Sequence, residues 1–143
     1  MTGVVADAPD GRGSLVLVGT PIGNLGDLAP RAAEALRTAD AIACEDTRHT
    51  RKLLTAAGID GKRLLAVHEH NEAVAADGIV GLIARGETVA LVTDAGMPGI
   101  SDPGERVVAA VAAAGQPITC VPGPSAVVVA LALSGLPTAP ART

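Results

Sequence analysis

The segment "LVTDAGMPGISDPGE", residues 91–105, passes from one kind of sequence pattern to another. It begins inside an apolar run at 88–93 that is typical of a buried strand, and it then becomes rich in Gly, Pro and Asp. Its end predicts a helix start, with Asp102 as N-cap, Pro103 at the first helical position and Glu105 at the third. The middle, "TDAGMPGIS", favours neither strand nor helix. We interpret it as a rigid loop of small residues, suited to a flat ligand lying along backbone N–H and C=O groups.

Strand-like and helical patterns alternate throughout the rest of the chain. Short apolar runs predict strands at 14–19, 40–45, 63–67, 88–93 and 117–121. Helical patterns lie between them at 30–39, 47–58, 72–86 and 103–114, with Gly78 and Gly81 weakening the third. Five strands separated by helical crossovers predict an α/β fold, with a five-stranded, mainly parallel sheet covered by helices on both faces.

The chain divides into three expected parts. Residues 1–13 predict a flexible tail, and residues 14–121 hold the α/β domain. The segment "PGPSAVVVALALSGLP", 122–137, starts as a turn and continues as a helix that is apolar nearly all round. Such a helix needs burial on more than one side. Residues 122–143 are therefore expected to be a linker and the first helix of a truncated second α/β domain.

Composition excludes several function classes. The 143 residues include no Phe, Tyr or Trp, which rules out a Tyr acid and an aromatic platform for stacking bases. A net charge of −4 does not favour nucleic-acid binding by the whole-chain field. Cys44 and Cys120 fall in apolar strand runs without metal-binding spacing, which predicts core thiols in a reducing compartment. We find no signal peptide, and no apolar run approaches the ~18 residues of a membrane span, so a cytoplasmic protein is expected.

The first strand is followed by "GTPIGNLGD", 19–27, whose glycines permit tight turning and close approach of a ligand. The spacing is GxxxGxxG and not the GxGxxG of dinucleotide-binding sites. Glu45 at the end of the second strand would suit a ribose hydroxyl, so an NAD-type oxidoreductase stays open as an alternative. Pro21 argues against it, because it stiffens the turn where a pyrophosphate would lie.

Three further strand ends carry polar residues. "EDTRHT", 45–50, allows two interpretations: Asp46 or Thr47 as a helix N-cap beside a solvated basic face, or a carboxylate–arginine pair facing a cleft. In "HEHNE", 68–72, extended backbone would place the two histidines on one face. No further ligand completes a metal site there, so substrate contacts or a plain surface loop are expected. In the loop after the fourth strand, Asp94 could accept from a ligand hydroxyl or ammonium, and Met97 could supply an apolar contact.

Together these loops resemble one family. "GTPIGNLGDLAPRA", "EDTRHTRKLL", "HEHNE", "DAGMPGISDPG" and "PGPSAVVVALALSGLPT" are similar, in this order, to the signatures of the ribosomal RNA small subunit methyltransferase I family. That family belongs to the tetrapyrrole-methylase superfamily. The resemblance covers about residues 14 to 138; Thr93, Met97 and the "TAPART" tail depart from the usual pattern.

The resemblance implies S-adenosylmethionine as methyl donor and 2′-O-methylation of a cytidine in small-subunit ribosomal RNA, with the 30S particle as partner. It also implies two α/β domains and a homodimer. The positions matching donor-binding residues are Pro21, Ile22, Asp94, Met97, Gly99, Ile100, Ser101, Ser125 and Ala126.

Removing the proton from a ribose hydroxyl calls for a general base. Glu45, Asp46 and His68 are the candidates, with Arg48 orienting a carboxylate or a phosphate. The expected substrate contacts are Arg51, Lys52, His70 and Asn71. Besides the oxidoreductase, two alternatives remain open: a precorrin or porphyrinogen C-methyltransferase with the same fold and donor, and a truncated remnant of the family that catalyses nothing.

Overall fold

The structure is a computed structural model that describes residues 13–20, 28–92 and 104–121. Several sequence predictions lie outside these residues. They are the N-terminal tail, the Gly-rich part of the first loop, the loop at 93–103 with its capping residue Asp102, and the apolar helix after 122.

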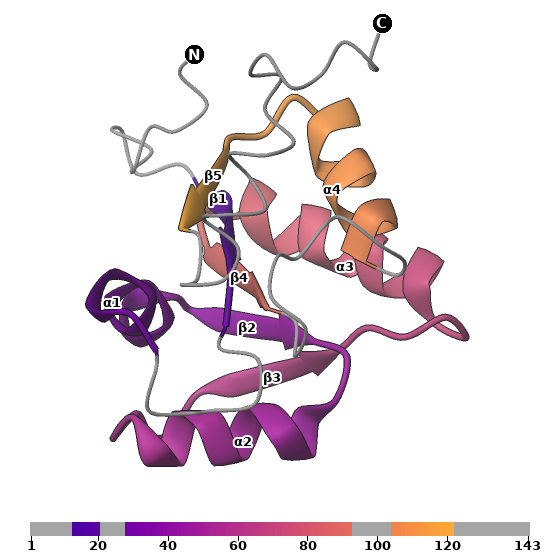
Figure 1. Cartoon of the computed structure of the whole chain (residues 1–143). Coiled ribbons are helices and arrows are strands. Elements are labelled where there is room, and N and C mark those ends of the chain that lie inside the picture. The colour runs from indigo at the N-terminus through magenta and orange to yellow at the C-terminus, as the bar shows by residue number, and fades with distance from the viewer. Residues whose placement is uncertain (1–12, 21–27, 93–103, 122–143) are drawn as a thin grey trace, which may run out of the picture.

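Strands and helices alternate as predicted, and their bounds agree with the sequence patterns within two residues (Figure 1). The elements are β1 Ser14–Val18, α1 Pro30–Thr38, β2 Ala41–Cys44, α2 Thr47–Ala56, β3 Arg63–Ala66, α3 Glu72–Ala84, β4 Thr88–Val92, α4 Gly104–Ala113 and β5 Ile118–Val121. The two glycines at 78 and 81 do not interrupt α3. In the described ranges, no helix combines the length and apolarity needed to cross a membrane.

All four strand pairs of the five-stranded sheet are parallel, and the strand order is β3-β2-β4-β1-β5. This order has a consequence for function. The dinucleotide-binding sheet has the order 3-2-1-4-5, in which β1 lies beside β2. Here β4 separates β1 from β2, so the oxidoreductase alternative lacks the fold that it requires.

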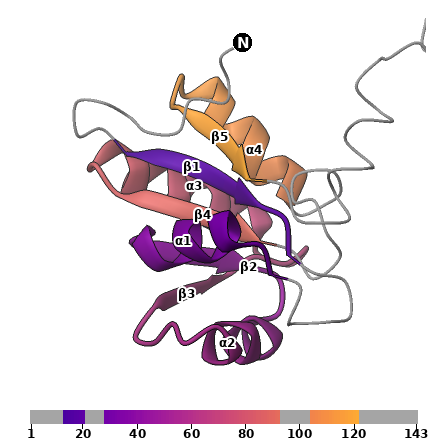
Figure 2. The ribbon, with the colours of Figure 1, turned by 60° about the vertical axis from the view of Figure 1, so that its left-hand side comes forward.

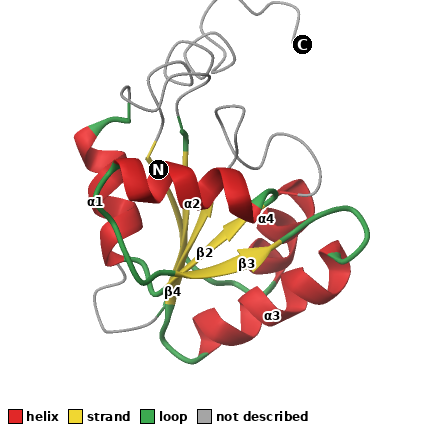
Figure 3. Cartoon of the chain, turned by 90° about the horizontal axis from the view of Figure 1, so that it is seen from below, coloured by secondary structure: helices red, strands yellow, loops and turns green. Residues whose placement is uncertain are grey.

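Each strand sends alternate side chains to opposite faces, and both faces are covered. Val16, Ile42 and Ala90 belong to a core beneath α1 and α2. Their chain neighbours Leu15 and Val89 belong to a second core beneath α3 and α4. Figures 2 and 3 show these two helix layers on either side of the sheet. The continuous apolar runs in the sequence reflect this two-sided burial.

Polar contacts fix the amino edge of the sheet. The backbone N–H of Thr88 donates to Asp40 Oδ2 at 2.8 Å, and the N–H of Asp40 donates to the carbonyl of Thr88 at 2.8 Å. Lys62 Nζ donates to the carbonyls of Arg37 and Ala39 at 2.5 and 2.6 Å, where α1 ends. A cation is favoured there because the last carbonyls of a helix carry partial negative charge.

Candidate functional site

Three strand ends meet at the carboxyl edge of the sheet. Val18, the last residue of β1, is the register partner of Val92 in β4 and of Val121 in β5. The N–H of Gly19 donates to the carbonyl of Val121 at 2.9 Å, and Gly19 and Thr20 are both buried. The three segments with predicted donor-binding residues therefore leave the sheet from adjacent points, although those residues themselves lie outside the described ranges.

This place is also where the chain changes direction across the sheet. From β1 the chain moves through α1 to β2, on the β3 side of the sheet. From β4 it moves through α4 to β5, on the opposite side, and the two helices cover opposite faces. In parallel sheets such a point leaves a crevice outside the strand ends, and ligands bind there.

The end of β2 adjoins this point and carries Glu45 and Asp46, both exposed. Asp46 is the N-cap of α2, as one of the two interpretations predicted. Its Oδ1 accepts from the N–H of Arg48 at 3.0 Å and from the N–H of His49 at 3.3 Å. These bonds satisfy two N–H groups that a helix start leaves without partners. Asp46 therefore has a structural role, whereas Glu45 has no such role in the cap.

The basic residues of α2 are exposed, and they do not act as one patch at the carboxyl edge. Arg48 lies in the first turn, next to the cap. Arg51 Nη1 donates to the carbonyl of Lys62 at 3.4 Å, just before β3 begins. Arg51 therefore reaches toward the amino end of β3, away from the strand ends, while Lys52 is exposed further along the helix.

The segment after β3 forms a turn, and the expectation of extended backbone at 68–72 is wrong. The N–H of Asn71 donates to the carbonyl of His68 at 3.0 Å, and Asn71 Oδ1 accepts from the N–H of His68 at 2.8 Å. Asn71 Nδ2 donates to the carbonyl of Ala66 at 3.0 Å. The imidazole rings of His68 and His70 lie 6.1 Å apart, edge to face. Asn71 thus orders the turn that positions both histidines.

Two buried polar atoms beside this turn have no hydrogen-bond partner: His68 Nδ1 and Glu72 Oε2. Glu72 begins α3, its side chain is 16% exposed, and its Oε1 lies 3.1 Å from Arg106 Nε on α4. Buried polar atoms without partners are rare, and each calls for an explanation such as an ordered water or a bound ligand. The sequence did not single out the Glu72–Arg106 pair, because its members are far apart in the chain; the "HEHNE" motif was the one available signal.

No group of three or more His, Cys, Asp or Glu in the described ranges could hold a metal ion. Both cysteines lie in strands, as predicted. Cys44 is fully buried and Cys120 is half-buried. Burial raises the pKa of the Cys120 thiol above its ordinary value of 9.0, because the thiolate loses solvation.

Comparison with known proteins identifies the family. The model of the tetrapyrrole (corrin/porphyrin) methylases matches residues 14–143. The chain belongs to this family. One tetrapyrrole methylase relative, "Ribosomal RNA small subunit methyltransferase I" of Xylella fastidiosa strain Temecula1, is 57% identical over 125 residues. The match covers 87% of the chain and 45% of the relative, so the chain spans about half the length of this relative.

Solved structures confirm the fold predicted for a tetrapyrrole methylase. The uroporphyrin-III-C-methyltransferase of Thermus thermophilus matches with a TM-score of 0.60 and 23% identity, over 79% of this chain and 48% of that one. A diphthine synthase matches with a TM-score of 0.62 and 17% identity, over 77% of this chain and 44% of that one. At these identities the likeness shows the arrangement of strands and helices alone.

Proposed function

We propose that the chain is part of an S-adenosylmethionine-dependent methyltransferase that modifies the 2′-oxygen of a cytidine in small-subunit ribosomal RNA. The observation that carries this proposal is the meeting of β1, β4 and β5 at the point where the sheet changes direction. The family and the name of the Xylella relative support methylation of small-subunit ribosomal RNA. The 2′-oxygen of a cytidine as the acceptor rests on the resemblance of the sequence motifs. In this assignment, residues 14–121 form the first domain and residues 122–143 begin a second.

The described residues at the proposed donor site fit a ligand that lies along the backbone. Gly19 has no side chain, so a ligand can approach the backbone closely there, and Thr20 is buried and does not project from the strand end. When bound, S-adenosylmethionine supplies an electrophilic methyl group on a sulfonium. The protein's main task is then to align the ribose oxygen, the methyl carbon and the sulfur for an in-line displacement.

One candidate base is His68, in the turn that follows β3. An imidazole can act as a general base, and the turn after β3 holds this one near the carboxyl end of that strand. Asn71 holds the backbone of this residue and is a positioning residue. Glu45, exposed at the end of the neighbouring strand β2, is the second candidate, and Arg48 can orient a phosphate or a carboxylate. Asp46 is less suited, since its Oδ1 caps α2.

A graft tests the proposal. Residues of this chain replace the matching 125-residue segment of the Xylella relative, and the product is incubated with methyl-labelled S-adenosylmethionine and unmethylated small ribosomal subunits. We expect label on a cytidine 2′-oxygen, located by nuclease digestion and mass spectrometry. His68→Ala should lower the transfer rate by a factor of about 10² or more with donor affinity unchanged. Glu45→Gln tests the second candidate base in the same assay.

Uroporphyrinogen III serves as the competing acceptor in the same assay. Label on the porphyrinogen instead of the RNA would favour the C-methyltransferase alternative. A folded graft that labels neither acceptor, while the unaltered relative labels RNA, would favour the non-catalytic remnant. We also propose a cytoplasmic protein that acts as a homodimer on the small subunit or its RNA, since this fits the family resemblance.

A further inference from the structure

Helices α3 and α4 pack on the same face of the sheet, and each begins after a segment of the proposed site. Helix α3 follows β3 and the turn at 68–71, which carries His68 and His70. Helix α4 follows β4 and residues 93–103, which include predicted donor-binding positions and lie outside the described ranges. A contact between the two helix starts therefore connects the histidine turn to the point where the predicted donor segment ends.

The strands that lead into these helices are not neighbours in the sheet. Strand β2 lies between β3 and β4, so the ends of β3 and β4 are about 10 Å apart at the usual spacing of strands. Methyl transfer needs its reacting atoms about 3–3.5 Å apart, and a displacement of about 1 Å is costly. Main-chain bonds hold the strands at their spacing, but the segments that follow the strands need contacts of their own.

One ion pair joins the two helix starts. Glu72 is the first residue of α3, and Arg106 lies in the first turn of α4. Arg106 Nε lies 3.1 Å from Glu72 Oε1. The side chain of Glu72 is 16% exposed, and that of Arg106 is 57% exposed. A mostly buried carboxylate is costly to leave without a positive charge, so this contact has more reason to persist than a pair of exposed side chains.

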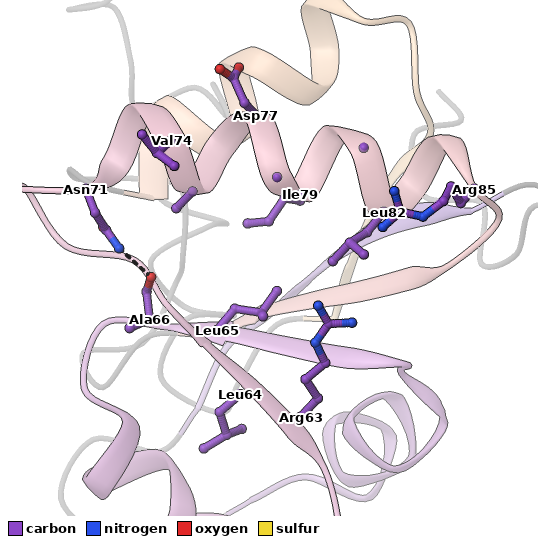
Figure 4. A pocket seen from close by; sticks show the side chains of 13 residues that line it. Arg63, Leu64, Leu65, Ala66, Asn71, Val74, Asp77, Ile79, Leu82 and Arg85 are labelled. Atoms are coloured by element: carbon purple, nitrogen blue, oxygen red, sulfur yellow. Dashed lines mark hydrogen bonds between the residues drawn. The ribbon is translucent and has the colours of Figure 1, made fainter.

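The histidine turn is directly continuous with Glu72. Asn71, the preceding residue, accepts from the N–H of His68 at 2.8 Å through its Oδ1. Its Nδ2 donates to the carbonyl of Ala66 at 3.0 Å, the bond that Figure 4 shows between the start of α3 and the end of β3. These bonds connect the turn to β3, and the contact of Glu72 with Arg106 connects it to α4.

We propose that Arg106 is a positioning residue for methyl transfer: through Glu72, it holds the turn of His68 and His70 in place relative to the start of α4. Arg106 does not touch the reacting atoms and acts only through its partner. The inference rests on the methyltransferase function proposed above. It adds a residue that the sequence motifs did not single out.

A second ion pair provides a matched control. Arg63 Nη1 and Glu87 Oε1 lie 4.0 Å apart, and their side chains are 58% and 32% exposed. Arg63 begins β3, and Glu87 comes directly before β4. This pair therefore joins segments of the same two strands at the amino edge of the sheet. Arg63→Ala removes the same charge from a similarly exposed arginine, far along the strand from the histidine turn.

Methyl transfer by the graft, with donor and ribosomal subunits saturating, tests the proposal. Arg106→Ala should lower kcat about tenfold or more, because it releases the turn without removing a reacting group. The KM for the subunits should change by less than about twofold, since no substrate contact is lost. Arg106→Lys should recover most of the rate, and Arg63→Ala should leave it unchanged. In a Glu72→Gln background, Arg106→Ala should have little further effect.

The three histidines of the chain give a second measurement that does not depend on methyl transfer. In NMR spectra of the chain with ¹³C-labelled histidine rings, Arg106→Ala should shift or broaden the signals of His68 and His70. The signal of His49, on α2, should stay in place. Arg106→Lys and Arg63→Ala should leave all three signals near their original positions. Circular dichroism at the assay temperature establishes that each variant is folded.

The outcomes separate this inference from the proposed function. An Arg106→Ala variant with unchanged kcat and unchanged His68 and His70 signals would overturn the inference. An equal loss of rate in Arg63→Ala would overturn it too, because the effect would then come from stability alone. A graft that transfers no methyl group to RNA before any substitution would overturn the proposed function. The histidine signals would then decide by themselves whether Arg106 holds the turn.

Discussion

Asp46 offers a direct separation of a structural role from a catalytic one. Its Oδ1 accepts from two backbone N–H groups at the start of α2, at 3.0 and 3.3 Å. Asp46→Ala removes this cap, which costs about 1 kcal/mol. It also removes a negative charge from the positive end of the helix, which adds about 0.3–1 kcal/mol. We therefore expect the free energy of unfolding to fall by about 1–2 kcal/mol.

Urea unfolding followed by circular dichroism at 222 nm measures this change. Asp46→Asn keeps the acceptor and loses only the charge, so its loss should be about 0.3–1 kcal/mol and should shrink as salt is added. Asp60→Ala, at an exposed carboxylate between α2 and β3, is the matched control. The reasoning is refuted if Asp46→Ala changes the free energy of unfolding by less than about 0.5 kcal/mol, the usual range for surface substitutions.

The same variants test whether Asp46 takes part in methyl transfer. In the graft with the Xylella relative, Asp46→Asn should retain methyl transfer, because the helix start stays capped. A loss of transfer by Asp46→Asn, with stability and donor affinity intact, would instead make Asp46 the general base.

Three further predictions can be tested by unfolding experiments. Gly13→Ala should lower the free energy of unfolding by about 1–3 kcal/mol, since its Cβ would overlap carbonyl oxygens of α3 and of the turn before β4. Gly78→Ala has open space around its Cβ and should raise the free energy of unfolding by up to about 1 kcal/mol; urea unfolding measures both changes. Burial disfavours the Cys120 thiolate and so raises the pKa of this thiol above 9.0 in the folded state. The resulting contribution to the free energy of unfolding is fully present below pH 9.0 and is lost as the pH rises through the pKa of the folded state. Unfolding of the chain and of Cys120→Ala between pH 7 and 10 measures that loss, and parallel curves would contradict it. Arg106→Ala should lower the free energy of unfolding by about 1–2 kcal/mol, because the mostly buried carboxylate of Glu72 loses its ion-pair partner. Arg106→Lys should recover part of this loss in the same assay.

The sequence predicted the elements well because each signal is local. Apolar runs mark strands buried on both faces, and glycines with φ near +70° follow the helices at Gly58 and Gly115. The strand order was not predictable in this way, since it depends on which strands pair across long stretches of chain. Placing β4 between β1 and β2 removed the dinucleotide alternative that the local glycines and Glu45 had left open.

In the candidate site, too, contacts between residues could not be predicted from local sequence patterns. The motif "EDTRHT" allowed two roles for Asp46, and the bonds to the helix N–H groups favour one of them. The turn at 68–71 was missed because it depends on the side chain of Asn71, which bonds backbone groups on both sides of the turn. The pair of Glu72 and Arg106 joins two helices that are neighbours in space but not in sequence.

Calorimetric titration of this chain with S-adenosylhomocysteine, with NAD as the control ligand, tests the methyltransferase assignment most directly. The three strand ends that meet at the carboxyl edge predict that S-adenosylhomocysteine binds and NAD does not. Binding of NAD by the folded chain, with no binding of S-adenosylhomocysteine, would contradict the assignment.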